Sequence, residues 1–281
     1  MNQALHAQSF YPLEPAWTDF ESALESAASA QGIFPGLKVR VFDTIESTND
    51  LCAAEAQRGA RGPLVVLADQ QTAGRGRQGS RWKSPPHCNL LMSIMLNVQG
   101  LGDDLLALAA SLAVADAIER SAPAMPVECR LKWPNDILLA DRKVAGILIE
   151  KPVTKGSDLA VIGIGVNVNQ VEFPPELTEH AVSMAMICGG PLSRFSLARE
   201  LLTALHHRLS PTPDKNEIAA AWKARCDMLG RRVSLETGGV VISGIVADID
   251  PFEGLVLRQD NGVLRMCHAA SSRMVRTLLA T

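Results

Sequence analysis

The sequence predicts an α+β protein made of a large mixed unit followed by a small β domain. Up to residue 230, apolar runs typical of buried strands alternate with segments of helical periodicity. From Arg231 on, short β runs are separated by Gly-Gly, Asp-Pro and Asn-Gly turns, which is typical of a small barrel or sandwich. With 281 residues, 47% of them hydrophobic, the chain can bury a substantial core. We therefore expect three regions: an extension with one helix (1–37), a main domain (38–230) and a C-terminal domain (231–281).

Helices and strands alternate in the first half of the chain. Residues 18–30 have the apolar spacing of an amphipathic helix, with acidic residues early. A second helix is expected to begin with Ser47 or Thr48 as its N-cap and to end at Gly59. The other elements predicted here are strands over 38–45, 63–70 and 89–98 and a long apolar helix over 103–121.

The second half returns to strands before two further helices. Residues 127–150 contain β runs on both sides of a Pro-Asn-Asp break and of a turn around Asp141. Another buried strand is predicted over 159–169. Helical periodicity follows over 193–209 and 216–229, up to the expected boundary near Gly230.

Charge and cysteine content exclude several classes of protein. The formal net charge is -3, so there is no global positive field to hold nucleic acid or an anionic membrane. The six cysteines are scattered without a C-x-x-C pair, which argues against structural zinc and a disulfide scaffold. The N-terminal residues lack the pattern of a secretory signal, and no stretch approaches 18 uninterrupted apolar residues. We expect a cytoplasmic protein that binds neither DNA nor membrane.

The segment QQTAGRGRQGSRW (70–82) places arginines among glycines directly after a buried strand. Glycine removes the Cβ that would block close approach, so backbone N–H groups and guanidiniums can converge on one phosphate or carboxylate. A solvated basic turn is an equally good explanation of such a short run taken alone. Other clusters are needed to decide between the two.

Three further clusters carry polar residues where a ligand would need them. ESTND (46–50) sets hydroxyls, an amide and free backbone N–H groups at a helix start, although capping alone would explain Ser47. KWPNDILLADRKVAG (132–146) brings together lysines, Asn135 and Asp136, although Lys143 also suits an ordinary hairpin. IGIGVNVN (162–169) ends an apolar strand with Asn167, which either caps the strand or faces a pocket.

Taken in order, these stretches resemble the biotin protein ligase family. The matching segments span about 120 residues: STN (47–49), QTAGRGRQG (71–79) followed by Trp82, KWPND (132–136), RKVAGIL (142–148) and GIGVN (163–167). The resemblance implies a catalytic domain like that of class II aminoacyl-tRNA synthetases, with a mixed sheet and flanking helices, followed by an SH3-like β-barrel. It extends less strictly over residues 38–281.

The resemblance also implies the reaction. Biotin and ATP would form biotinyl-5'-AMP, and biotin would then pass to a lysine of a biotin carboxyl carrier protein of acetyl-CoA carboxylase or a related carboxylase. Mg²⁺ is expected with ATP, and no residue is assigned as a metal ligand. The residues implied for biotin are Ser47, Thr48, Asn49, Gln71, Gly74, Arg75, Gly76, Arg77, Lys143 and Gly146. Those implied for ATP are Arg75, Trp82, Lys132, Asn135 and Asn167.

Catalytic roles are implied for Arg75, Arg77, Lys143 and Asp136. The arginines would neutralise the α-phosphate and close the loop over the adenylate, while Lys143 would contact the biotin carboxylate and the α-phosphate. Asp136 would either orient or deprotonate the incoming lysine, or coordinate the metal; both roles stay open. Ser80 stands where many relatives carry a third arginine.

Two alternatives have the same overall plan: a lipoate-type protein ligase and a non-catalytic biotin-sensing regulator. Residues 1–37 are too short and too acidic for a winged helix-turn-helix, which indicates the monofunctional type of ligase. The oligomeric state is open and includes a homodimer. Five arginines of the C-terminal domain give it a local positive balance that would suit an acidic carrier or ATP: Arg232, Arg258, Arg265, Arg273 and Arg276.

Overall fold

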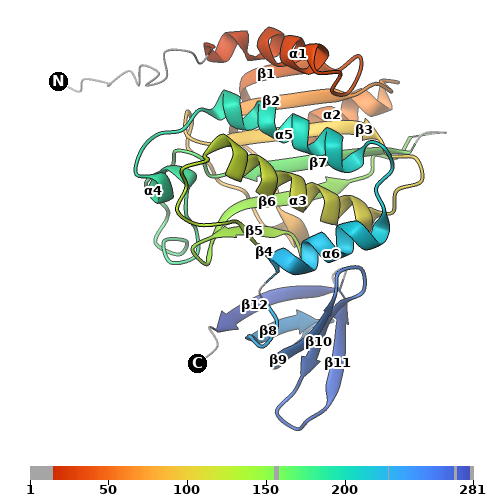
Figure 1. The fold of residues 1–281 in the computed structure, drawn as a ribbon, viewed down its shortest axis with the longest axis vertical. Helices are drawn as coiled ribbons and strands as arrows, with labels where there is room; N and C mark the ends of the chain where they lie inside the picture. Colours follow the sequence, from red (N-terminus) through yellow and green to blue (C-terminus); the bar gives the residue numbers. More distant parts are fainter. Residues whose placement is uncertain (1–14, 155–157, 227, 269–270, 279–281) are drawn as a thin grey trace.

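The structure is a computed structural model that describes residues 15–154, 158–226, 228–268 and 271–278 (Figure 1). It contains a seven-stranded mixed sheet with helices on both faces and a separate five-stranded antiparallel sheet. The predicted α+β class is therefore confirmed. Residues 1–14 of the expected N-terminal extension lie outside the described residues.

The main sheet has the strand order β1-β2-β3-β7-β6-β5-β4. Only β1 and β2 pair in parallel; the other neighbours are antiparallel. The bounds are β1 (Lys38–Ile45), β2 (Leu64–Gln71), β3 (Leu90–Asn97), β4 (Arg130–Lys132), β5 (Asp136–Leu139), β6 (Arg142–Glu150) and β7 (Leu159–Val166). The apolar runs predicted as strands thus form one continuous sheet.

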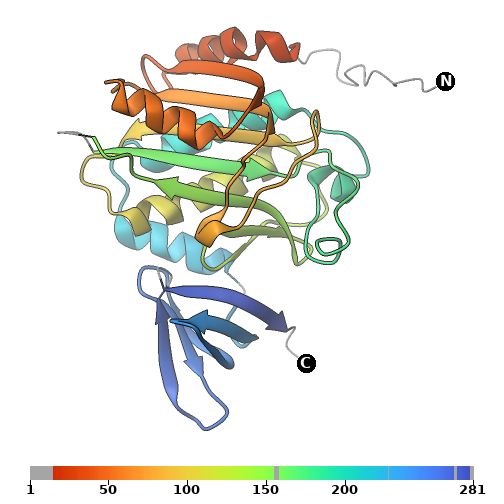
Figure 2. The ribbon, with the colours of Figure 1, turned by 180° about the vertical axis from the view of Figure 1, so that it is seen from behind.

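Helices cover the two faces of this sheet unequally. The first face carries α3 (Asp103–Ser121), α5 (Arg194–Leu209) and α6 (Lys215–Arg225), and α1 (Phe20–Ala30) lies beside β1 and α5 (Figure 1). Eleven residues of α3 are buried, which explains its nearly uniform apolar sequence. The opposite face carries α2 (Thr48–Gln57) and leaves β6 and β7 accessible to a long loop (Figure 2).

Alternation along the strands divides the two faces. In β7, Ile162 and Ile164 point into the main core, whereas Val161 belongs to a smaller cluster beneath α2. Gly163 and Gly165 share the side of Val161, so this face of the strand has no side chains at its centre. The strand therefore leaves room above it, on the α2 face.

The helix predicted over 216–229 ends early, at Arg225. Cys226 adopts an extended conformation and bridges to Leu131 of the neighbouring strand β4, so the chain leaves the helix to reach the second sheet. A short helix, α4 (Met184–Cys188), was not predicted. With five residues it shows no helical periodicity in the sequence, although Ser183 caps it and Gly189 ends it at φ +76°.

The C-terminal sheet has the order β11-β10-β9-β8-β12. Gly238 and Gly239, both with positive φ, join its first two strands, as a two-residue hairpin turn requires. The strands are β8 (Arg232–Thr237), β9 (Val240–Asp250), β10 (Gly254–Arg258), β11 (Leu264–His268) and β12 (Ser272–Leu278). The inward-facing residues Val233, Leu235, Leu255 and Leu257 are buried, and they belong to the same apolar cluster as the core of the main sheet.

Candidate functional site

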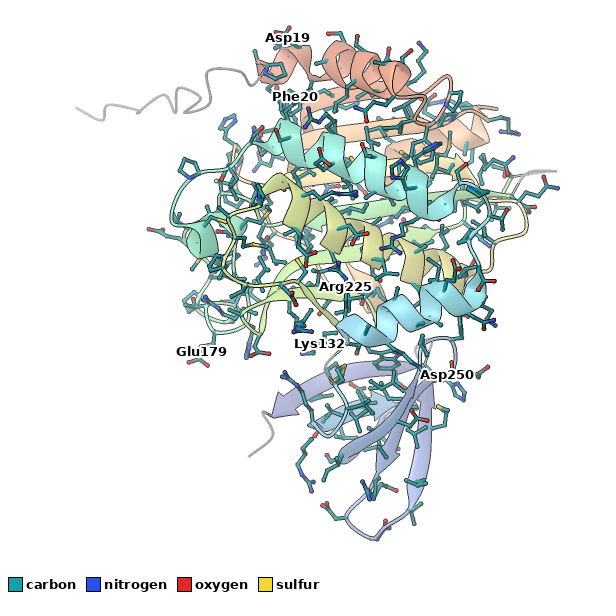
Figure 3. The ribbon with its side chains drawn as sticks, viewed as in Figure 1. Asp19, Phe20, Lys132, Glu179, Arg225 and Asp250 are labelled. Atoms are coloured by element: carbon teal, nitrogen blue, oxygen red, sulfur yellow. The ribbon has the colours of Figure 1, made fainter. Side chains whose placement is uncertain are left out.

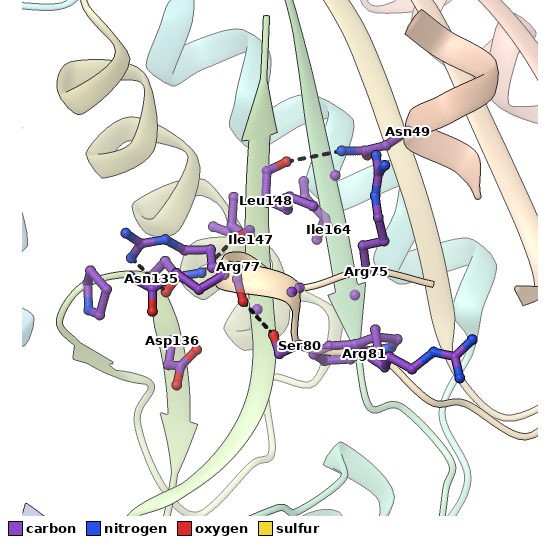
Figure 4. Close-up of a pocket in the computed structure, with 18 of the residues that line it drawn as sticks. Asn49, Arg75, Arg77, Ser80, Arg81, Asn135, Asp136, Ile147, Leu148 and Ile164 are labelled. Carbon is purple, nitrogen blue, oxygen red and sulfur yellow. Dashed lines mark hydrogen bonds between the residues drawn. The ribbon is translucent and has the colours of Figure 1, made fainter. Parts of the chain in front are cut away.

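A cavity of about 490 Å³ lies on the α2 face of the main sheet (Figure 4). Its floor is the central part of β6 and β7, and one wall is the start of α2. The loop from Thr72 to Trp82, here the arginine loop, covers it, and Ser272 and Met274 of β12 complete it from the C-terminal sheet. Motifs far apart in the sequence thus meet around one space.

Backbone contacts fold the arginine loop into a narrow hairpin. The N–H of Trp82 donates to Gly74 O at 3.0 Å, and the N–H of Gly76 donates to Ser80 O at 2.8 Å. A Cβ on Gly74 would lie 2.6 Å from the carbonyl oxygen of Trp82, so glycine is required for this approach. Gly74 therefore shapes the loop without lining the cavity, whereas Gly76 does both.

Arg75 is held by two carboxylates of the protein. Its Nη2 lies 2.6 Å from Asp50 Oδ1 on α2 and 2.8 Å from Glu150 Oε2 at the end of β6. All three side chains are between about a third and a half exposed, where an ion pair contributes only about 0–1 kcal/mol. A stronger anion in the cavity can therefore replace these carboxylates.

Arg77 points to the opposite end of the cavity (Figure 4). Its Nη1 donates to Asn135 Oδ1 at 3.4 Å, and Asn135 in turn donates to Ile147 O on β6 at 2.6 Å. Burial lowers the pKa of the Arg77 guanidinium, and the charge of Asp136 opposes that shift. The guanidinium stays protonated at neutral pH, since arginine titrates far above it.

Lys143 lies between a carboxylate and an indole. Its Nζ is 2.6 Å from Asp136 Oδ1 and 5.6 Å from the centre of the Trp82 ring. A Cβ on Gly146 would come within 3.2 Å of both Lys143 and Trp82, so the missing side chain makes space for both. Trp82 Nε1 is buried and has no hydrogen-bond partner among the residues that the structure describes, so it remains a donor for a ligand.

The α2 end of the cavity is a network of uncharged polar groups. Ser47 caps the helix by accepting from the N–H of Asp50, as predicted. Gln71 Oε1 accepts from the backbone N–H of Thr48 at 2.8 Å and lies 3.1 Å from its hydroxyl. Behind them, Asn49 contacts Glu150 at 2.7 Å and Ser93 at 2.6 Å. Hydroxyl and amide groups at this end suit a small polar ring.

Most of the residues that the sequence analysis singled out line this cavity, and three do not. Those that line it are Ser47, Thr48, Asn49, Gln71, Arg75, Gly76, Arg77, Trp82, Asn135, Asp136, Lys143 and Gly146. Gly74 supports the loop from behind. Lys132 lies on β4, close to the end of α6 (Figure 3). Asn167 is buried just after β7, where its amide donates to Val182 O at 3.2 Å and to Lys143 O at 3.4 Å.

Other residues of the site were not predicted. Gly163 and Gly165 leave space for Asn49 and Trp82 respectively, since a Cβ on either would collide with that side chain. Their spacing of two in a strand motif was the available signal. No local pattern in the sequence indicated the other residues of the site, because their contacts join distant parts of the chain. They are Ser93, Glu150, Gln78, Ser272 and Met274.

The remaining chemistry of the described residues is limited. No group of three or more His, Cys, Asp and Glu side chains in the described ranges is arranged to hold a metal ion. No helix in the part of the chain that the structure describes is long and apolar enough to cross a membrane. None of the six cysteines, all of which lie in the described ranges, forms a disulfide, and burial raises the pKa of Cys52 to about 12. The cavity is therefore the main candidate for chemistry.

Comparison with known proteins agrees with this geometry. Residues 41–169 match the Biotin/lipoate A/B protein ligase family, and residues 228–271 match the Biotin protein ligase C terminal domain. The chain is 34% identical over 235 residues to a biotin--[acetyl-CoA-carboxylase] ligase of Mycobacterium tuberculosis, covering 80% of this chain and 86% of that protein. It is 31% identical over 248 residues to the bifunctional ligase/repressor BirA of Escherichia coli, covering 86% and 75%.

Solved structures show the same fold. A biotin protein ligase from Aquifex aeolicus, in complex with biotin and ATP, superposes with a TM-score of 0.72 at 27% identity, covering 85% of this chain and 98% of that one. The two matched regions include all of the clusters around the cavity and most of the C-terminal sheet. The fold and the sequence motifs of the chain agree with those of the matched proteins, so the chain belongs to the biotin protein ligase family.

Proposed function

We propose that this protein activates biotin with ATP as biotinyl-5'-AMP and transfers biotin to a lysine of a carrier protein. The observation that carries the proposal is the set of groups that line one cavity: neutral hydrogen-bonding groups at the α2 end, together with the four cations Arg75, Arg77, Arg81 and Lys143. Biotin has a ureido ring at one end and a carboxylate at the other, so it matches both kinds of group. The similar ligase of A. aeolicus has been solved with both biotin and ATP.

In the first half-reaction a carboxylate oxygen of biotin attacks the α-phosphorus of ATP. The bond from the α-phosphorus to the bridging oxygen breaks, and pyrophosphate leaves. Arg75, Arg77 and Lys143 would stabilise the negative charge that develops there, each contact contributing about 1.5–3 kcal/mol. The arginine loop over the cavity would also exclude water from the reactive acyl phosphate.

In the second half-reaction a carrier lysine attacks the acyl carbon, AMP leaves, and the amine loses a proton. A free lysine has a pKa of about 10.4, so presenting its neutral form at pH 7 costs about 4–5 kcal/mol. Asp136 is the acidic side chain that lines the cavity, among the residues that the structure describes. The contact of 2.6 Å between Asp136 Oδ1 and Lys143 Nζ supports a role for Asp136 in orienting Lys143. If Lys143 turns to the bound ligand instead, Asp136 becomes able to accept a proton from the carrier lysine.

We assign Mg²⁺ to the triphosphate rather than to a protein cage, because the cavity offers a single carboxylate among the described residues. The proposed partner is a biotin carboxyl carrier protein of a carboxylase, as the name of the M. tuberculosis relative suggests. Six cysteines without a disulfide between them and the need for ATP favour the cytoplasm as the place of the reaction. DNA is not among the proposed partners, given the net charge of -3; a homodimer is to be tested by light scattering.

Lipoate is the competing substrate within this family. Its dithiolane ring has neither an N–H nor a carbonyl group, so it would exclude water from the hydroxyl and amide groups at the α2 end of the cavity without forming the hydrogen bonds that a ureido ring can form. Each such lost hydrogen bond costs about 1–3 kcal/mol, so this end discriminates against lipoate. The match of residues 228–271 to the Biotin protein ligase C terminal domain points the same way.

The test is incubation of the protein with ATP, Mg²⁺, biotin and an isolated carrier domain, followed by mass spectrometry of the carrier. We expect a mass gain of one biotin, none with lipoate, and none when the acceptor lysine of the carrier is replaced by arginine. Biotin binding without any transfer would instead support a non-catalytic biotin sensor.

A further inference from the structure

The alternation of side chains along β6 is interrupted next to the cavity. Gly146 and Leu148 line the cavity. Ala145 and Ile147, which alternate with them, belong to the main core, as the period of two in a strand requires. Val144 should then face the cavity, yet it is fully buried in the same core as Ala145. Two successive side chains of β6 therefore point to one face of the sheet.

The interruption is a β-bulge opposite β5. Ile137 on β5 pairs with Ala145. The next residue on β5, Leu138, pairs with Lys143, so Val144 is an extra residue that has no counterpart on β5. A shift of one residue turns every side chain that follows to the other face of a strand.

This bulge decides which face of the sheet Lys143 occupies. In a regular strand Lys143 would share the core face with Ala145, two residues away. Because of the extra residue, it lies instead opposite Leu138, which shares a face of β5 with Asp136. A diagonal contact across the two strands results, in which Lys143 Nζ lies 2.6 Å from Asp136 Oδ1.

Contacts on the other side of β6 hold the bulge in place. The carbonyl oxygen of Val144 accepts from the N–H of Asn167, the first residue after β7, at 2.8 Å. A different segment then takes the place of β7. The N–H of Lys143 donates to His180 O at 2.7 Å, and Lys143 O accepts from the N–H of Val182 at 3.0 Å. These bonds and the burial of Val144 fix the position of the extra residue.

The turn between β5 and β6 fixes the pairing at the other end of the hairpin. Ala140 and Asp141 have φ values of 47° and 60°, as a two-residue turn of type I′ requires. Leu139 and Arg142 pair directly beside this turn. The extra residue therefore cannot move into the turn without breaking that pair.

We infer that Val144 is a positioning residue that turns Lys143 out of the core and into the cavity. The inference rests on the proposed function, in which Lys143 stabilises the charge that develops during adenylate formation. Activity then requires the bulge as well as the lysine. A lysine in place of Val144 should be inactive in this backbone and active in a backbone without the bulge.

Two changes, made separately and together, test this requirement. The swapped variant combines Lys143→Val with Val144→Lys, so its composition is that of the wild type. The insertion variant carries one extra alanine between Ile137 and Leu138, which gives Val144 a counterpart on β5 and removes the bulge. The residue after Leu138 is also leucine, so each face of β5 keeps a leucine. The control is one extra alanine after Gly62, in an exposed loop.

The measurement is pyrophosphate exchange by the full chain with biotin, ATP and Mg²⁺. We expect the rate to fall by about 100-fold or more in the swapped variant and in the insertion variant, because the ammonium leaves the cavity in both. With both changes together, the lysine of Val144→Lys faces the cavity two residues from Gly146, as Lys143 does in the wild type. We expect this combined variant to be at least about 10-fold faster than the insertion variant, and the control to match the wild type.

Thiol labelling tests the directions of the two side chains without any activity. The thiol of Lys143→Cys should react with iodoacetamide, because the Lys143 side chain is 35% exposed. The thiol of Val144→Cys should not react, because Val144 is fully buried. Mass spectrometry of the labelled peptide separates these thiols from the native cysteines.

The reverse order of reactivity would overturn the inference. So would a combined variant that unfolds cooperatively on heating but exchanges pyrophosphate no faster than the insertion variant. If the combined variant does not fold, the labelling decides. A wild-type protein that shows no pyrophosphate exchange but labels as expected would refute the proposed function and not the direction of Lys143, which is a distinct result.

Discussion

Two cations of the cavity, Lys143 and Arg75, are paired with carboxylates of the protein. Lys143 contacts Asp136, and Arg75 contacts both Asp50 and Glu150. Without these partners, the cations would repel one another around a partly dehydrated space. Because such half-exposed pairs are weak, we expect the carboxylates to stabilise the site and to be displaced by the biotin carboxylate and the α-phosphate.

The first prediction at this scale concerns Lys143→Ala. Lys143 touches only polar or aromatic groups around the cavity, so the variant should fold, although biotin affinity should fall because the contact with the biotin carboxylate is lost. The rate of adenylate formation should fall by about 100-fold or more, because a group that stabilises transition-state charge is lost. Pyrophosphate exchange measures this, with Lys38→Ala, an exposed lysine on β1, as the control. Wild-type exchange in a folded Lys143→Ala protein would refute the assignment.

A second prediction concerns Gly165, in the floor of the cavity. A Cβ here would lie 2.5 Å from Trp82 Cε2, so Gly165→Ala must displace the indole. Overpacking of this kind costs about 1–3 kcal/mol, and we expect biotin affinity to fall by about 10-fold or more. Gly62→Ala is the control, since a Cβ there meets nothing within 4 Å. Equal affinities of the two variants in biotin titrations would show that Trp82 does not depend on this space.

At the scale of elements, local signals predicted most helices and strands. Alternation and apolar runs located β1, β2, β3 and β7, and of the two residues predicted as the cap of α2, Ser47 or Thr48, it is Ser47 that caps it. Contacts between distant elements had no such signal: Ser93 sits in an apolar run typical of a buried strand, yet its hydroxyl meets Asn49, 44 residues away. The early end of α6 has the same cause, because a bridge from Cys226 to Leu131 outweighs the helical periodicity.

The turn between β9 and β10 gives a prediction with a pH dependence. Asp250 accepts from the N–H groups of Phe252 at 2.8 Å and Glu253 at 3.1 Å, and these bonds lower the pKa of its carboxyl. Lys223 and Lys215 on α6 lower the pKa further, and Asp250 lies at the end of the C-terminal sheet nearest that helix (Figure 3). The charged carboxylate therefore stabilises the folded state.

A carboxyl whose folded pKa is depressed contributes stability above its unfolded pKa of about 3.9, and that stability is lost as the pH falls through the folded value. We expect Asp250→Ala to lower the free energy of unfolding by about 1 kcal/mol at neutral pH and by progressively less below about pH 4. Calorimetric melting across this range measures the difference, with exposed Asp43→Ala as the control. A difference that does not shrink in acid would contradict the assigned role.

At the scale of the whole molecule, the C-terminal sheet forms part of the cavity wall. Gln78 of the arginine loop donates to Ser272 O at 3.4 Å, and both Ser272 and Met274 line the cavity. Of the arginines expected to form a basic surface on this domain, Arg258 and Arg265 are exposed. Arg232 forms an ion pair with Asp260 at 2.6 Å, which offsets its charge. The side chains of Arg273 and Arg276 lie outside the described part of the chain. Docking of an acidic carrier by these arginines stays a prediction.

The last prediction separates the contribution of β12 to the reaction from its contribution to folding. Truncation after Leu229 should impair pyrophosphate exchange and transfer to the carrier more than biotin binding. The residues proposed to bind biotin, such as Thr48 and Gln71, all precede Leu229, whereas Ser272 and Met274 line the cavity from the C-terminal sheet. Truncation also exposes Met228, which is buried against Trp133, so the shorter chain can lose its fold.

The substitution Met274→Ala in the full chain avoids that difficulty. Its control is Val275→Ala, at an exposed neighbouring position on the same strand. We expect the KM for ATP to rise several-fold in Met274→Ala while biotin affinity holds. Equal losses of both in Met274→Ala would mean that the C-terminal sheet acts on the cavity only through stability.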